Sequence, residues 1–111
     1  MTTTIYSFVP VKKRMKILEF INYHLQQFPK CQLSDVKVIN GFSLISYGLN
    51  TVFSHLELKF RGLEGVSLLI PLFNYNEWVI IYHRLTFGDV LFEKSTITEA
   101  LNKVTELILI S

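Results

Sequence analysis

The stretch from Val66 to Leu85 decides the fold. It consists of two apolar runs, VSLLIPLF over Val66–Phe73 and WVIIYHRL over Trp78–Leu85, joined by the turn-like segment NYNE. Two such runs around a short turn predict a β-hairpin. Side chains alternate across a strand, and here both alternating sets are largely apolar, so the hairpin needs a cover on each face. We expect helices of this chain to supply one cover, and a second subunit or a partner protein to supply the other.

Length and composition limit the class of protein. The chain has 111 residues, of which 50% are hydrophobic and 18% charged. This length predicts one domain over residues 1–111. A domain this small buries only about two thirds of the surface of its unfolded chain, so some large apolar side chains are expected at the surface or against a partner. The sequence shows no membrane-spanning stretch or basic leader, and Cys31 stands alone, so we expect a cytoplasmic protein without membrane contact.

Two helices are predicted, one towards each end of the chain. In Pro10–Phe28 the apolar residues recur at three- and four-residue steps. A second helix is expected over Thr96–Ile108, because its first residue and Glu99 have the spacing of a capping box. Leu109 and Ile110 fall outside the apolar stripe of that helix, so we expect them either to be buried on several sides or to take part in a contact.

The middle of the chain predicts an antiparallel meander. Asp35–Ile39 and Phe42–Tyr47 flank an Asn-Gly pair, the strongest short hairpin-turn signal, although a bulge at Gly41 in one long bent strand is the alternative. Val52–Arg61 alternates most clearly, and Val90–Glu93 can extend the pairing. In Val52–Arg61 the residues expected to face the core are Leu56, Leu58 and Phe60, and those expected to face away are His55, Glu57, Lys59 and Arg61.

These elements define a fold class. We predict an α+β domain in which a four- to five-stranded antiparallel sheet (meander) has an N-terminal and a C-terminal helix packed on one face.

A search for catalytic and metal-binding patterns gives little. No histidine, cysteine or carboxylate motif has metal-ligand spacing, and no phosphate loop or nucleophile motif is present, so no metal, cofactor or catalytic residue is predicted. Within a strand, His83 and Arg84 could form an anion pocket, but alternation puts them on opposite faces. A half-exposed strand is the more ordinary interpretation. Catalysis would therefore require His83 to act together with His55 across the sheet.

Basic residues concentrate near the N-terminus and raise a nucleic-acid alternative. Residues 1–40 hold six basic and two acidic residues. The cluster at the start of the first helix could contact phosphates, and consists of Lys12, Lys13, Arg14 and Lys16. A solvated basic turn is the more ordinary interpretation, because the net charge of the chain is only +2 and no recognition motif is visible.

Apolar residues at strand ends or off the inward face suggest a protein interface, because aromatic residues are enriched in such contacts. The candidate residues are Tyr47, Phe53, Leu69, Phe73, Tyr75 and Trp78. We therefore predict a small non-enzymatic protein–protein interaction module, acting as a homodimer or as an accessory or inhibitor bound to a larger protein. Such a form would suit a protein encoded by a virus or mobile element. The alternatives are nucleic-acid binding through Lys12–Lys16 and, third, a small enzyme.

Overall fold

The computed structural model describes residues 11–43, 52–72, 75–84, 88 and 90–110, with the backbone alone for 11–14, 40–43 and 52–53. They form an α+β fold, as predicted. The helices are α2 (Val11–Leu25) and α3 (Ile97–Ile110), and between them come the strands β1 (Leu33–Ser43), β2 (Val52–Phe60), β3 (Val66–Pro71), β4 (Val79–Arg84) and β5 (Val90–Ser95). No helix in this part of the chain has the length and apolar character to cross a membrane.

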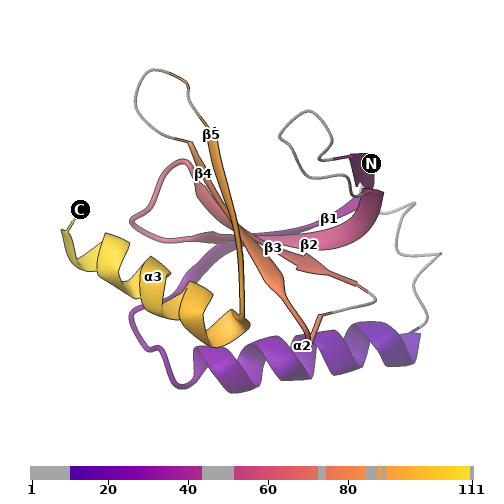
Figure 1. The fold of residues 1–111 in the computed structure, drawn as a ribbon. Helices are drawn as coiled ribbons and strands as arrows, with labels where there is room; N and C mark the ends of the chain where they lie inside the picture. Colours follow the sequence, from indigo (N-terminus) through magenta and orange to yellow (C-terminus); the bar gives the residue numbers. More distant parts are fainter. Residues whose placement is uncertain (1–10, 44–51, 73–74, 85–87, 89, 111) are drawn as a thin grey trace.

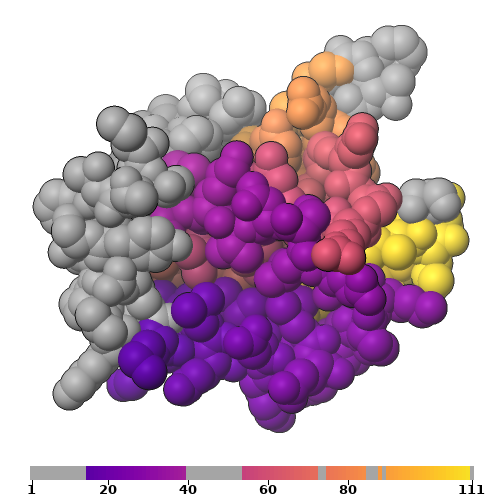
Figure 2. Space-filling model, turned by 180° about the vertical axis from the view of Figure 1, so that it is seen from behind, coloured from indigo at the N-terminus to yellow at the C-terminus, as the bar shows by residue number. Residues whose placement is uncertain are grey.

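The five strands form one antiparallel sheet in the order β1-β2-β3-β4-β5, so each strand pairs with its neighbours along the chain. The sheet is strongly twisted, and both helices lie below it on the same side (Figure 1). Seen from behind, α2 forms the lower border and β1 lies above it at the surface (Figure 2). The helices therefore cover one face of the sheet, as predicted.

The main core lies between the helices and that face of the sheet. At its centre Leu68 of β3 is fully buried, and it lies directly opposite Leu58 of β2 and Ile81 of β4. From the helices, Ile17 of α2 and Leu101 of α3 pack into the same cluster and are also fully buried. The inward set predicted for β2, with Leu56, Leu58 and Phe60, is confirmed by the burial of all three.

The first strand is a single long strand with two irregularities. β1 runs continuously from Leu33 to Ser43, and its register with β2 shifts between Ile39 and Phe42. The predicted hairpin turn at Asn40-Gly41 is therefore wrong, and the alternative of a bulge in one bent strand is confirmed. An Asn-Gly pair favours a tight turn only when the segments on both sides pair with each other, and here both pair with β2 instead.

Several boundaries differ from those expected. β3 ends at Pro71, which pairs with β2 but has no N–H to donate to a ladder. β5 pairs with β4 along its whole length, beyond the predicted Glu93. α3 extends to Ile110, and its last residues are 65% (Leu109) and 80% (Ile110) exposed. Of the two alternatives for these residues, burial is wrong, and a contact with a partner stays a prediction.

Half of the predicted capping box at the start of α3 is present, because Thr96 caps the Glu99 N–H while the Glu99 side chain accepts from the Thr96 hydroxyl. The Glu99 N–H donates to Thr96 Oγ1 at 3.2 Å, and the Thr96 hydroxyl donates to Glu99 Oε1 at 3.1 Å. We expect Thr96→Ala to lower the free energy of unfolding by about 1 kcal/mol, because a first-turn N–H loses its acceptor. Urea titration should detect this loss, and Thr98→Ala, a change at an exposed position two residues later, is the control. Equal losses for the two variants would contradict a capping role.

Candidate functional site: the open face of the sheet

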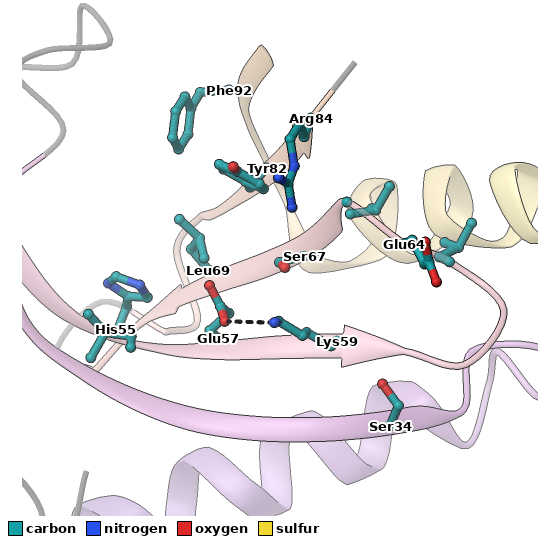
Figure 3. Close-up of a pocket in the computed structure, with 14 residues that line it drawn as sticks. Ser34, His55, Glu57, Lys59, Glu64, Ser67, Leu69, Tyr82, Arg84 and Phe92 are labelled. Atoms are coloured by element: carbon teal, nitrogen blue, oxygen red, sulfur yellow. Dashed lines mark ion pairs between the residues drawn. The ribbon is translucent and has the colours of Figure 1, made fainter. Parts of the chain in front are cut away.

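The sheet face that the helices leave uncovered carries a groove of about 720 Å³. A row of four residues crosses it, one from each of β2 to β5: Lys59 lies opposite Ser67, Ser67 opposite Tyr82, and Tyr82 opposite Phe92. All four line the groove, and Figure 3 shows Tyr82 and Phe92 on the β4–β5 side, across from Lys59. The register of the strands thus brings cationic, hydroxyl and aromatic groups around one hollow.

A small second core forms the apolar floor of this face. Leu69 and Ile80 are only 3% and 2% exposed and lie directly opposite each other on β3 and β4. Three partly buried aromatic residues pack on this pair: Trp78, Tyr82 and Phe92. The ring centroids of Tyr82 and Phe92 are 5.2 Å apart in an edge-to-face arrangement. The chain's own aromatic residues therefore supply the second cover for Leu69 and Ile80 that we had expected from a second chain.

Four charges form an alternating lattice on the open face of β1 and β2. Asp35 lies directly opposite Lys59, and Lys37 directly opposite Glu57. Along each strand the charges also alternate, with Lys37 Nζ 3.7 Å from Asp35 Oδ2 and Lys59 Nζ 3.9 Å from Glu57 Oε1. Opposite charges at directly facing positions stabilise a sheet modestly. The two positive and two negative charges of this lattice therefore sum to zero.

Arg84 stands on the other side of the groove, at the end of β4. Its backbone N–H donates to the carbonyl oxygen of Gly65 at 2.7 Å, which fixes the strand end against the β2–β3 turn. The Arg84 side chain is exposed and lines the groove, and in Figure 3 its guanidinium points down towards Ser67. Glu64, also exposed, lies at the same end of the groove.

Gly65 allows the backbone of the β2–β3 turn to lie close to Arg84, because glycine has no Cβ. Its φ is 75°, in the left-handed region, and a Cβ there would lie 3.3 Å from the Arg84 carbonyl oxygen. We expect Gly65→Ala to lower the free energy of unfolding by about 1–2 kcal/mol for its left-handed conformation, and by more than Gly62→Ala because the added Cβ crowds the Arg84 carbonyl oxygen. Gly62→Ala is a matched control, since Gly62 has a φ of 83° but no atom within 4 Å of the added Cβ. If urea titration gives Gly65→Ala no larger loss than Gly62→Ala, crowding at Arg84 has no energetic role.

The histidines do not form an acid–base pair. Alternation on β4 is as predicted: His83 lies opposite Val66 of the core face, whereas Arg84 lines the groove. His55 also lines the groove, so it lies on the opposite face from His83, with β3 between their strands. The suggested pairing of His55 and His83 is therefore wrong. His55 is also only 2% exposed although its face was correctly predicted, because it sits between Ile39 of β1 and Pro71 of β3.

The predicted interface residues are distributed over two clusters. Leu69 and Trp78 belong together in the second core under the groove. Tyr75 packs against the main core instead, with its ring 5.2 Å from that of Phe20 in α2. Tyr47 and Phe73 lie outside the described residues, as does the side chain of Phe53. The predicted interface set did not include Ser67, Tyr82 or Phe92, and it treated Arg84 only as part of a possible anion pocket with His83. The register between strands brings these groove residues together.

The other candidates stay apart from this site. Lys16 is exposed on α2, while the side chains of Lys12, Lys13 and Arg14 lie outside the described part of the structure, so nucleic-acid binding stays a prediction. Cys31 is buried, and its Sγ lies 3.2 Å from Thr105 Oγ1. Burial raises the pKa of the Cys31 thiol, and the hydrogen bond to Thr105 opposes that shift. In the residues that the structure describes, no three His, Cys, Asp or Glu side chains group closely enough to hold a metal ion.

No protein-family model matches the chain, and no curated protein or solved structure is similar enough to match it. Proposals about function therefore depend on the groove and on the chemistry of the residues around it.

Proposed function

We propose that this protein is a non-enzymatic protein-interaction module that holds a polypeptide segment of its partner in the groove on the open sheet face. The observation that carries the proposal is the composition of the groove. Aromatic side chains of Tyr82 and Phe92 provide apolar contact area, and charged side chains of both signs surround them. Rigid aromatic anchors beside polar groups are typical of protein interfaces, where apolar contact gives affinity and charge gives specificity.

A polypeptide suits this groove better than a small apolar ligand or a uniformly charged polymer. The groove is open along the sheet, and its ionisable lining residues include two carboxylates, Glu57 and Glu64, as well as Lys59 and Arg84. A nucleic acid would meet both carboxylates with its phosphates, and like charges at an interface are unfavourable. An extended peptide can present both signs of charge and apolar side chains within one short segment.

The partner that supplies the segment is either a second copy of this chain or a larger protein to which this one is an accessory or inhibitor. Sedimentation equilibrium separates these two forms of the proposal. A homodimer would sediment above the mass of one chain at micromolar concentration. A single-chain mass over the whole accessible range would leave the accessory form. The lone cysteine favours a reducing compartment, so we propose that this binding takes place in the cytoplasm.

Panning of a random-peptide display library on the immobilised protein tests the proposal. We expect the enriched peptides to bind with a micromolar Kd. This Kd can be measured from the fluorescence of Trp78, the single tryptophan of the chain, which packs beside the groove. Tyr82→Ala should weaken their binding about tenfold, as expected for loss of an aromatic anchor. Tyr23→Ala is the control, because Tyr23 is 63% exposed on α2, on the other side of the sheet. No enriched peptide, or equal weakening by both variants, would refute groove binding.

A further inference from the structure

Arg84 is a cation of the groove lining that forms no ion pair with any of the described residues. Lys59, the other cation in the lining, belongs to the neutral lattice, with Asp35 opposite it and Glu57 beside it. Arg84 lies across the groove from that lattice. Among the described residues no carboxylate oxygen lies within 4.0 Å of its guanidinium. Glu64 lies at the same end of the groove without forming an ion pair with Arg84, so the Arg84 guanidinium keeps its N–H donors for a bound group.

The surroundings of Arg84 are built to receive an anion. Its main chain is anchored to Gly65, and its guanidinium turns into the groove above Ser67 (Figure 3). Ser67 is 5% exposed, and within the described structure its hydroxyl makes no side-chain hydrogen bond, so it can donate to a bound group. A guanidinium presents its N–H donors in a planar fork that matches both oxygens of a carboxylate. Arg84 and Ser67 thus form one donor site.

Tyr82 of the aromatic pair lies two residues before Arg84 on the same strand. Both side chains point to the same face, and Phe92 lies directly opposite Tyr82. Side chains two residues apart on a strand are separated by about 7 Å, and the same spacing holds along an extended peptide. A peptide lying along β4 with an acidic side chain over Arg84 would therefore place its side chain two residues away over Tyr82 and Phe92.

We propose that Arg84, together with the Ser67 hydroxyl, binds the carboxylate of an acidic side chain of the partner segment, and that Tyr82 and Phe92 contact an apolar side chain two residues away from it. This inference rests on the proposed function, because it names the chemistry of the segment that the groove would hold. The pattern recognised is acidic-x-apolar, in either chain direction.

The sequences of the panned peptides give the first test. Peptides that bind through the groove are those whose binding Tyr82→Ala weakens. Their sequences should be enriched in an aspartate or glutamate two residues from an apolar residue. Groove-binding peptides without this enrichment would overturn the inference while leaving the proposed function intact. The absence of any groove-binding peptide would refute the proposed function, and this inference would fall with it.

A charge swap gives the second test, with the tightest of those peptides as the probe. Replacing its acidic residue by the corresponding amide should raise Kd about fivefold, and Arg84→Glu should raise it about tenfold, because the contact changes from attraction to repulsion. Arg84→Gln provides a milder variant should the reversal disturb folding. Lys103→Glu changes the net charge of the protein equally at an exposed position on α3 and should have little effect.

Binding of the Arg84→Glu variant to a peptide with lysine in place of the acid should return to within about threefold of the original Kd, because the pair is restored with reversed signs. Acetate and inorganic phosphate at millimolar concentration serve as free-anion probes. We expect neither to displace the peptide, since the aromatic contact contributes to its binding. Displacement by either ion, or equal effects of Arg84→Glu and Lys103→Glu, would overturn the assignment of Arg84 to a peptide carboxylate.

Discussion

Replacing Leu68 by Ala is expected to lower the free energy of unfolding by about 3 kcal/mol, the largest effect of any change considered for this protein. Leu68 is fully buried at the centre of the sheet, between Leu58 and Ile81 on the neighbouring strands. Truncation removes its buried methyl groups and leaves a cavity that packed neighbours on both sides cannot close. Urea unfolding followed by circular dichroism measures the loss.

Leu91→Ala is the matched control for this change. Leu91 lies on the edge strand β5 and is 48% exposed, so the same truncation removes little buried surface and should cost less than about 0.5 kcal/mol. Similar losses at Leu68 and Leu91 would mean that the main core is not centred on β3 as described.

Leu69→Lys is expected to lower the free energy of unfolding by about 2 kcal/mol, the second-largest effect. Leu69 follows Leu68 on β3 but faces the groove, where it is only 3% exposed under the aromatic residues. The loss corresponds to the burial of one leucine side chain. A lysine stem can direct its amine towards Glu57, which lies directly opposite, so the charge itself adds little.

This second change bears on how association should be tested. Leu69 is one of the candidate interface residues, but a Leu69→Lys variant that is already destabilised cannot report on an interface alone. Exposed groove residues such as Arg84 are better probes. Should Leu69→Lys prove as stable as the unchanged protein in urea, the second core does not contribute to folding, and Leu69 is available for a contact.

Alternation of side chains made the arrangement around β3 predictable. The double apolar pattern of Val66–Phe73 predicted that both faces of this strand would be buried, and Leu68 and Leu69 are both buried. Periodicity also predicted the two helices, and the spacing of Thr96 and Glu99 predicted the start of α3. These signals are local, because each depends on residues within a few positions of one another.

The groove could not be predicted because it depends on register between strands. The row from Lys59 through Ser67 and Tyr82 joins residues of three strands, and a shift of one residue in either pairing would place different side chains there. The same limit explains His55, whose burial is set by its neighbours on β1 and β3. It also explains why Gly41 lies in a bulge and not in a turn, because the β1 residues on both sides of it pair with β2.

The strict meander order of the sheet has a consequence for how the protein folds. Every pair of adjacent strands is also adjacent in the chain, so each hairpin forms by closing a short loop, which costs little entropy. The two helices, by contrast, pack together from opposite ends of the described chain. In the segment after α2, for example, the Cys31 thiol lies 3.6 Å from the carbonyl oxygen of Leu101 in α3. The sheet can therefore assemble by zipping outwards from β3, and docking of the terminal helices completes the core.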